Sequence, residues 1–355
     1  MQDARRSARA PAHSLTAPSG GDGPSRSECR GRAAKGLANP RACGATRKSG
    51  VARSFIPNPA PILRHAGPTM PDTRDPRLTP ARPDLADIRL RGVVTAERYV
   101  AGEPARVAVP SAPLRRAPRL EAGLETEAVM GDAVTVFEIR DGFAWGQIAR
   151  DGYVGYLPET ALGAIDPAPT HRVAALRTFV YPAPDLKRPH LAHLSLGAAF
   201  AAEAQEGEYW RLAGGGYVFA GHAVPLGTAE PDFPATAERL VGTPYLWGGR
   251  TSLGLDCSGL VQLCLETAGR ACPRDADQQE RGLGTALPPG LDGLRRGDLV
   301  FWKGHVGMML DADRLIHANG HHMAVAVEPL REAVERIAVK SFGAVTAIRR
   351  LDPIA

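Results

Sequence analysis

The sequence predicts an α+β domain at the carboxyl end of the chain, preceded by two small all-β barrels. Short runs of alternating apolar and polar residues, separated by turn-forming Gly and Asp, occupy residues 120–163 and recur more loosely over 171–226. This period of two is typical of small antiparallel barrels. From residue 231 onward, helix-like runs come first and apolar strand-like runs follow. That order is typical of an α+β domain.

The 355 residues suffice for two or three domains, each with its own core. No stretch approaches the roughly 18 consecutive apolar residues of a membrane span, so we expect no membrane partner. The net charge is +5, but residues 1–69 carry +9 and the remainder carries −4. The folded part is therefore mildly acidic, and we expect it not to bind nucleic acid. The five cysteines form no CxxC pair, which argues against a disulfide framework and favours a reducing compartment.

Residues 1–69 are rich in Arg, Ala, Gly, Ser and Pro and show no sustained apolar period. This composition predicts a disordered basic leader, with a transit peptide as a less favoured interpretation. The leader lacks the apolar core of a secretory signal, so we expect a cytoplasmic protein. The composition changes at Met70, which is an alternative start that would leave residues 1–69 untranslated.

The barrels are expected within residues 70–165 and 166–229. The first range should begin with an extended Pro- and Arg-rich arm over 70–117, followed by strands at 133–139, 143–148 and 152–157. The second range should hold strands at 177–181, 198–200, 209–212 and 216–219. Similar aromatic pairs recur in both ranges, which indicates an internal duplication. Such barrels often serve only as binding or spacing modules.

Residues 230–355 should form the α+β domain, papain-like in outline. The expected helices are 234–240 and 257–268, and the expected strands are 299–302, 306–310, 315–318 and 344–351.

Cys257 is the candidate nucleophile. It follows a glycine-rich turn and begins a predicted helix, so its thiol would face the free N–H groups and the positive end of that helix. This position lowers a thiol pKa and favours the thiolate. Asp256 or Ser258 would cap the helix. Cys264 and Cys272 are better explained as small buried hydrophobes.

His305 and His317 lie on two predicted neighbouring strands, which would bring their side chains together. A Cys–His pair with a polar third group is the arrangement that activates a thiol nucleophile. Asn319 is an alternative orienting residue. Cys257 and the two histidines could instead bind zinc, but tight local ligand spacing is absent, so we expect no metal and no other cofactor.

Five motifs resemble, in order and spacing, the NlpC-type cysteine peptidases of bacterial cell-wall metabolism. They are Tyr-Leu-Trp-Gly-Gly (245–249), Asp-Cys-Ser-Gly-Leu-Val (256–261), Gly-Asp-Leu-Val-Phe-Trp (297–302), His-Val-Gly (305–307) and Leu-Ile-His-Ala (315–318). Both barrels resemble bacterial SH3-like domains. The combination is similar to the γ-D-glutamyl-L-diamino-acid endopeptidases of the dipeptidyl-peptidase VI type.

The resemblance implies Cys257 as nucleophile, His305 as base and His317 as the orienting third residue. It also implies that Asp256 holds the free amino terminus of an L-Ala-γ-D-Glu-diamino-acid peptide. A carboxylate beside the nucleophile needs a cationic partner, which the substrate ammonium would supply. The alternative is that Asp256 only caps the helix.

Further cleft residues follow from the same resemblance. Tyr245, Trp247 and Ser258 would line the cleft, and the backbone N–H of Cys257 would serve in an oxyanion hole. The first barrel would contribute an aromatic residue, Tyr153 or, second, Tyr156. Its acidic partner is left open among Glu121, Glu125 and Glu127.

The implied activity is hydrolysis of γ-D-glutamyl–diamino-acid bonds in peptidoglycan-derived peptides with a free N-terminal L-Ala, for recycling or remodelling. The family commonly has Pro-Arg-Asp-Ser after the helix, whereas this chain has Ala276 in place of the serine, which leaves diaminopimelate or lysine open. Two alternatives remain: a cell-wall peptide-binding protein with a non-hydrolytic domain, and a related amidase or acyltransferase. The oligomeric state is not predicted.

Overall fold

The structure is a computed structural model that describes residues 75–352. The predicted leader 1–69 and the alternative start Met70 lie outside the described residues. Within the described part of the chain, no helix has the length and apolar character needed to cross a membrane.

The first β-module, residues 103–163, is a seven-stranded sheet in the order β5-β4-β8-β7-β6-β3-β9. Its strands are β3 (Glu103–Val107), β4 (Ser111–Arg115), β5 (Leu124–Val129), β6 (Ala133–Arg140), β7 (Phe143–Ile148), β8 (Val154–Pro158) and β9 (Leu162–Gly163). Alternate residues of these strands point inward and form one apolar core around Leu114, Ile148 and Leu157. A short parallel pair precedes it, β1 (Leu85–Asp87) with β2 (Arg98–Val100).

The predicted extended arm over 70–117 is wrong in its second half, because β3 and β4 are strands of this sheet. Pro104 and Pro113 interrupt the alternating pattern that would have identified them. Prolines are tolerated at strand edges and irregularities, so the sheet accommodates what the pattern obscured.

The second β-module, residues 171–225, contains a five-stranded and a three-stranded sheet around a shared core. Its strands are β10 (His171–Val173), β11 (Arg177–Tyr181), β12 (Ala192–Ser195), β13 (Ala199–Phe200), β14 (Ala202–Glu206), β15 (Tyr209–Leu212), β16 (Tyr217–Phe219) and β17 (Ala223–Pro225).

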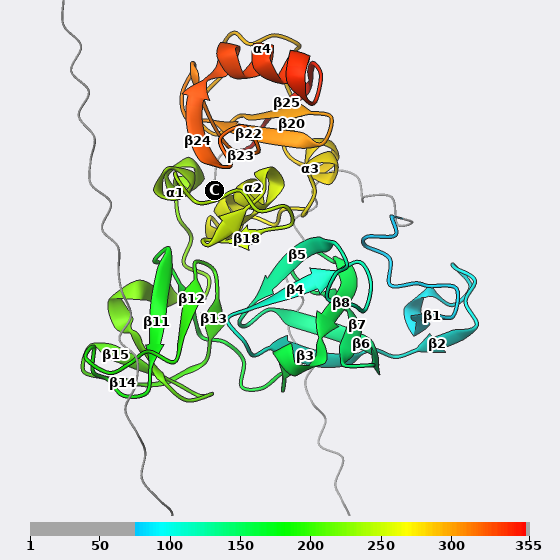
Figure 1. Cartoon of the computed structure of the whole chain (residues 1–355), viewed down its shortest axis with the longest axis vertical. Helices are drawn as coiled ribbons and strands as arrows, with labels where there is room; N and C mark the ends of the chain where they lie inside the picture. Colours follow the sequence, from blue (N-terminus) through cyan, green and yellow to red (C-terminus); the bar gives the residue numbers. More distant parts are fainter. Residues whose placement is uncertain (1–74, 353–355) are drawn as a thin grey trace, which may run out of the picture. The chain divides into compact units, whose positions relative to one another are not determined.

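The carboxyl-terminal part is a six-stranded antiparallel sheet with helices on both faces (Figure 1). The sheet order is β20-β25-β21-β22-β23-β24. Its strands are β20 (Thr285–Ala286), β21 (Leu299–Trp302), β22 (His305–Met309), β23 (Arg314–Asn319), β24 (Ala324–Pro329) and β25 (Val345–Arg350). Around it lie α1 (Phe233–Arg239), the pair β18 (Arg250–Thr251) and β19 (Gly254–Leu255), α2 (Cys257–Thr267), α3 (Ala276–Gly282) and α4 (Leu330–Lys340).

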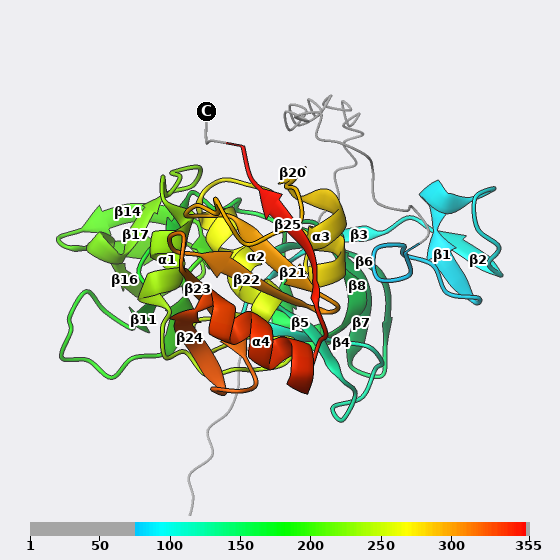
Figure 2. The same ribbon diagram turned by 90° about the horizontal axis from the view of Figure 1, so that it is seen from above.

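The two faces of this sheet carry different helices, α2 on one and α4 on the other (Figure 2). Val306 and Met308 pack with α2, whereas Met309 and Leu315 pack with α4. Because side chains alternate along a strand, His305 and His317 belong to the α4 face. Helix α4 was not predicted, although it covers the strands that carry both histidines.

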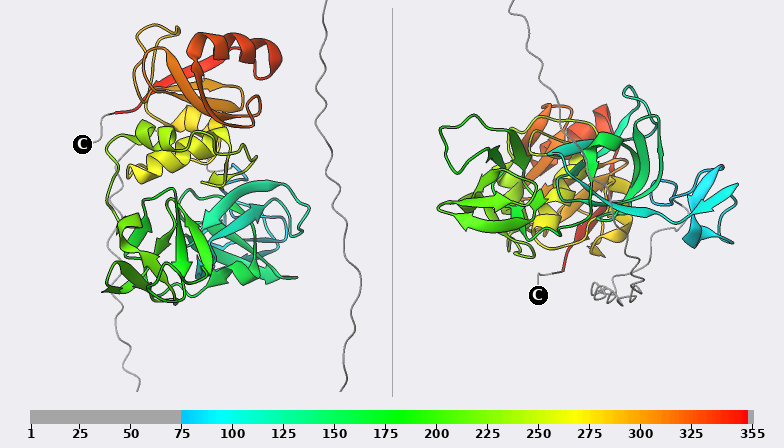
Figure 3. Two further views of the ribbon diagram at one scale, coloured as in Figure 1. Left: turned by 60° about the vertical axis from the view of Figure 1, so that its left-hand side comes forward. Right: turned by 90° about the horizontal axis from the view of Figure 1, so that it is seen from below.

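The first β-module contacts α2 and the turn before it, and Figure 3 shows α2 (yellow) beside this module from two further directions. Arg150 pairs with Asp132, with Asp151 at 3.1 Å and with Glu266 of α2 at 3.1 Å. Glu266 also pairs with Arg250 of β18. These contacts place the first β-module against the carboxyl end of α2.

Candidate active site

Cys257 is the first residue of α2, and the residues around it fix the helix start. The Asp256 carboxylate caps the helix by accepting a hydrogen bond of 2.7 Å from the N–H of Gly259. A side chain at Gly259 would lie 2.3 Å from the carbonyl oxygen of Gly249, so only glycine lets the helix approach the preceding turn. This close approach holds Cys257 beside the turn that carries Tyr245.

Asp256 already has a cationic partner inside the protein. Arg274, fully buried, reaches its two oxygens at 2.9 and 2.7 Å. The N–H of Gly248 donates a further bond of 2.9 Å. Contrary to the prediction, Asp256 does not depend on a substrate ammonium for its balancing charge, because Arg274 balances it before any ligand binds. The capping role weighed as the alternative is present in the structure.

The thiol of Cys257 is buried and neutral in this environment. Burial raises the pKa of Cys257 to about 12, and the Asp256 carboxylate raises it further, while the N–H groups of Val306 and Ser258 oppose the shift. The predicted lowering of this pKa by the helix start is wrong in direction, because desolvation outweighs the helix end. The sulfur accepts a hydrogen bond from Val306, the neighbour of His305.

Four buried or half-buried side chains follow one another on the α4 face of the sheet. The Nε2 atom of His305 lies 2.8 Å from Nδ1 of His317. The Nε2 atom of His317 lies 2.5 Å from Oε1 of Glu328 on β24. Arg336 of α4 then holds both carboxylate oxygens of Glu328, at 2.5 and 2.7 Å.

Burial keeps both imidazoles neutral. It lowers the pKa of His305 to about 3, with a smaller contribution from His317. It also lowers the pKa of His317, although Glu328 opposes that shift. The ring of Phe342, just after α4, stacks parallel to His305 with centroids 5.1 Å apart. Asn319, the alternative orienting residue, instead donates to the carbonyl of His317 and accepts from His322.

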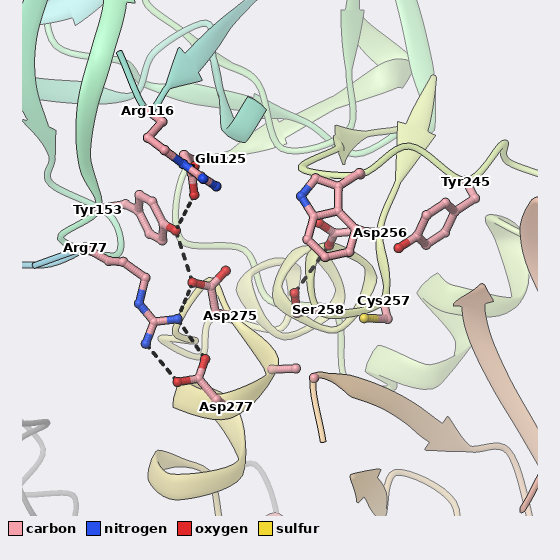
Figure 4. Close-up of a pocket in the computed structure, with 13 residues that line it drawn as sticks. Arg77, Arg116, Glu125, Tyr153, Tyr245, Asp256, Cys257, Ser258, Asp275 and Asp277 are labelled. Carbon is pink, nitrogen blue, oxygen red and sulfur yellow. Dashed lines mark hydrogen bonds and ion pairs between the residues drawn. The ribbon is translucent and has the colours of Figure 1, made fainter. Parts of the chain in front are cut away.

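A pocket of about 250 Å³ opens in front of Cys257 (Figure 4). The residues lining it come from the N-terminal segment, the first β-module and the α+β domain: Arg77, Arg116, Glu125, Tyr153, Tyr245, Trp247, Asp256, Cys257, Ser258, Asp275, Ala276, Asp277 and Gly304. The first-choice site residues from the sequence, apart from the two histidines, all line this pocket. The two histidines do not line the pocket, although His305 directly follows Gly304, which does.

At the end of the pocket opposite Cys257 lie carboxylate oxygens, a tyrosine hydroxyl and two guanidinium groups (Figure 4). The hydroxyl of Tyr153 lies 3.3 Å from Glu125 and 3.1 Å from Asp275. Arg116 pairs with Glu125 at 2.5 Å, and Arg77 reaches Asp275 at 2.7 Å. Tyr153 therefore joins a carboxylate of the first β-module to one of α3.

Of the three glutamates left open by the sequence, Glu125 lines the pocket. Glu127 accepts a hydrogen bond of 2.9 Å from the N–H of Arg250, and Glu121 is exposed. Tyr156, the second-choice aromatic residue, lies in an adjoining pocket and contacts Arg82 at 3.1 Å.

Four charged pocket residues were not predicted as site residues: Arg77, Arg116, Asp275 and Asp277. Asp275 had a sequence signal, since it begins α3 as the first residue of a capping box. Arg77 had none, because it lies about two hundred residues from its partners and only the fold brings it there. Among residues 75–352, no group of three His, Cys, Asp or Glu side chains is suited to hold a metal ion.

Comparison with known proteins identifies two matching families. Residues 242–340 match the NlpC/P60 family, and residues 114–162 match the bacterial dipeptidyl-peptidase SH3 domain. Over 257 residues the chain is 28% identical to a γ-D-glutamyl-L-lysine dipeptidyl-peptidase of Bacillus subtilis, covering 68% of this chain and 74% of that protein. A Bacillus cereus protein of the same name is 25% identical over 245 residues, covering 58% and 71%.

A solved structure of an NlpC/P60 family protein from Bacillus cereus superposes with a TM-score of 0.58 at 20% identity. The match covers 70% of this chain and 99% of that one. At this identity the likeness shows the fold, a papain-like domain in a chain of mostly β content.

Proposed function

From the premise that this chain is a cysteine-type peptidase with an NlpC/P60 domain (242–340) after a bacterial SH3 domain (114–162), we propose that it hydrolyses peptidoglycan-derived peptides. The bond cleaved is the one between γ-D-glutamate and diaminopimelate or lysine, in peptides whose N-terminal L-Ala is free. The observation that carries this proposal is the pocket of Figure 4, in which Cys257 lies at one end and Glu125 and Tyr153 of the first β-module close the other.

Cys257, His305 and His317 are proposed as the catalytic residues. The sulfur attacks the γ-carbonyl carbon while the thiol proton passes to the neutral imidazole of His305. His305 then gives the proton to the departing amine, and water hydrolyses the thioester. His317 holds the ring of His305 through the 2.8 Å contact. The N–H of Cys257 has no helical partner in the first turn and is proposed to stabilise the oxyanion.

The charge of the pocket supports binding of one ammonium group. Four carboxylates and two guanidiniums line it. Asp256 is balanced separately by Arg274, so the remaining groups carry an excess of one negative charge. Glu125, Asp275 and the Tyr153 hydroxyl present acceptors at the end of the pocket far from Cys257. A free N-terminal amine supplies three N–H donors and one positive charge, which matches this set.

The other substrate contacts that we propose are made by residues that line the pocket. Tyr245, Trp247 and Ser258 also line the pocket, and Figure 4 shows Tyr245 on the Cys257 side of it, with its hydroxyl directed inward. Asp256 acts on the substrate mainly by fixing the wall of the pocket, because its oxygens are already bonded. A pocket closed by the first β-module favours short peptides over intact wall, and thus peptide recycling.

The domain organisation is proposed on the same basis. We propose an arm and first SH3-like domain over 70–165, a second SH3-like domain over 166–229 and the peptidase domain over 230–355. The second β-module supports this with its five- and three-stranded sheets around one core. Its role is proposed to be that of a spacer, since none of its residues lines the pocket in front of Cys257.

Incubation of L-Ala-γ-D-Glu-diaminopimelate with the wild type and with Cys257→Ala tests the activity. We expect the wild type to release L-Ala-γ-D-Glu and free diaminopimelate, and the variant to release neither, because Cys257 supplies the thiol among the residues described as lining this pocket. Cys264→Ala is the matched control and should retain turnover, since Cys264 of α2 is buried in the hydrophobic core of the domain. Equal turnover by the wild type and Cys257→Ala would contradict the proposal.

A further inference from the structure

The proposed catalytic histidines do not end the row of polar side chains; Glu328 and Arg336 extend it by two residues. We infer that Glu328 is a positioning residue that fixes the proton arrangement of both histidines, and that Arg336 holds Glu328 in place for this task. The inference rests on the proposed function, because it assigns His305 as the base. Neither residue belongs to the sequence motifs that suggested the site.

The sheet register brings the three strand residues together. Met308 of β22 pairs with Ile316 of β23. In this register His305 and His317 lie on the same face of the sheet as diagonal neighbours. His317 pairs with Ala326, so Glu328 is likewise its diagonal neighbour on that face. Diagonal neighbours are within reach of long side chains. The side-chain distances of 2.8 and 2.5 Å show that each reaches the next.

The charge of Glu328 determines which atom carries each proton. Burial raises the pKa of Glu328, but the hydrogen bond that it accepts from His317 and the nearby Arg336 guanidinium outweigh burial and lower that pKa. An ionised carboxylate can only accept, so the proton in the 2.5 Å contact belongs to Nε2 of His317. A neutral imidazole with a proton on Nε2 has its lone pair on Nδ1.

The position of the proton on His317 determines the position of the proton on His305. Nδ1 of His317 must accept in the 2.8 Å contact, so Nε2 of His305 donates. The neutral ring of His305 then has its lone pair on Nδ1, which is the only nitrogen left to take a proton from the thiol. Without Glu328, His317 could carry its proton on Nδ1 instead, and His305 could then hold its lone pair on the wrong nitrogen.

Arg336 makes this arrangement stable. It comes from α4, covers both oxygens of Glu328 and is the cation that a mostly buried carboxylate requires. The side chains of Glu328 and Arg336 are 10% and 16% exposed, so water competes weakly for either. His322, in the loop before β24, is the other titratable group that acts on both His317 and Glu328.

Phe342 restricts the remaining freedom of the base. Its ring stacks on His305 with an interplanar angle of 5°, and Trp302 contacts His305 with centroids 5.5 Å apart. These rings hold the plane of the imidazole, whereas Glu328 selects the nitrogen that is protonated. Helix α4, which provides Arg336 and leads to Phe342, is thus part of the catalytic apparatus through these contacts.

Steady-state kinetics on L-Ala-γ-D-Glu-diaminopimelate with Glu328→Leu, Glu328→Gln, Arg336→Met and Arg336→Lys tests the inference. We expect Glu328→Leu to lower kcat about 10- to 100-fold, with KM changed less than about twofold, because substrate contacts are untouched. The kcat of Glu328→Gln should lie between that of Glu328→Leu and that of the wild type. Arg336→Met should lower kcat, and Arg336→Lys should restore most of it.

Asp298→Asn is the matched control. Asp298 is a buried carboxylate of the same domain held by Arg350 at 2.8 and 2.6 Å, with no contact to either histidine. It should lose stability as the Glu328 variants do, yet keep kcat. If Glu328→Leu and Asp298→Asn lower kcat equally, Glu328 has only a structural role and the inference is wrong. If the wild type itself does not hydrolyse the peptide, the proposed function fails first.

Nitrogen-15 NMR of the histidine side chains gives a readout independent of turnover. In the wild type we expect His305 and His317 to appear as neutral rings with protons on Nε2. In Glu328→Leu, signals of the two rings should shift toward a mixture of both tautomers. A wild-type His317 with its proton on Nδ1, or unchanged signals in Glu328→Leu, would overturn the inference.

Discussion

At the scale of single residues, burial determines the resting charges of Cys257 and His305, the proposed nucleophile and base. The thiol of Cys257 and the ring of His305 each lose solvation on folding, so the thiol pKa rises and the imidazole pKa falls. Both groups are then neutral near pH 7. In the proposed mechanism the pair would therefore act by general-base catalysis rather than as a preformed thiolate–imidazolium pair.

This resting state predicts the pH dependence of alkylation. Only the thiolate reacts with iodoacetamide, and below the raised pKa of Cys257 its population increases with every step up in pH. The labelling rate at Cys257 should therefore rise continuously between about pH 5 and pH 9. Mass spectrometry of labelled peptides measures it. A preformed ion pair would instead give a rate that is already high and level across this range, which would contradict the account.

The sequence motifs suggested Cys257, His305 and His317 as site residues but did not indicate their charge. The fold brings the two histidines to 2.8 Å and places the N–H of Val306, the neighbour of His305, against the Cys257 sulfur. The sign of the pKa shift at Cys257 depends on how deeply the fold buries the helix start. Glu328 carried no sequence signal, since its partners lie on another strand and on a helix that was not predicted.

At the scale of elements, the amino end of α2 is held by one buried arginine. Arg274 contacts Asp256, Ser258 and the Thr126 hydroxyl of β5. It thereby links the helix start to the first β-module and keeps the wall of the pocket in place. The sequence predicted α2 within one residue because its cap and apolar period are local, whereas Arg274 acts through the tertiary fold.

Arg274→Met should lower the free energy of unfolding by about 3–5 kcal/mol, because it leaves the buried Asp256 carboxylate without its cation. Urea denaturation followed by circular dichroism measures the change. Arg331→Met is the control, since Arg331 forms only an exposed pair with Asp292 and should change stability by less than about 1 kcal/mol. Equal effects of the two substitutions would show that the Asp256–Arg274 pair is not the anchor.

At the scale of the whole described molecule, the first β-module and the peptidase domain share a buried ionic network. Arg150 balances Asp132, Asp151 and Glu266, and Glu266 also meets Arg250. Three carboxylates and two guanidiniums thus link two segments with separate cores. The sequence predicted each core from its own periodicity, but a network between them leaves no periodic signal.

Arg150→Met should destabilise the protein by about 3–5 kcal/mol and separate the unfolding of the two cores. The physical reason is that Asp151 and Glu266 then repel across the contact without a shared cation. Differential scanning calorimetry should show one transition for the wild type and a broadened or split one for the variant. Arg188→Met, at an exposed pair with Asp185, serves as control. A variant that melts as the wild type does would contradict a coupling role for the network.

The central claim is that the first β-module selects peptides by their free amino end, and one comparison tests it most directly. The measurement is kcat/KM of the wild type and of Glu125→Gln on L-Ala-γ-D-Glu-diaminopimelate and on its N-acetylated form. The account predicts that acetylation lowers the wild-type value at least about 100-fold, because it removes the charge that the pocket carboxylates balance. Glu125→Gln should raise KM for the free peptide. It should also reduce the difference in kcat/KM between the free and the acetylated peptide. Equal values for the free and the acetylated peptide would contradict the account.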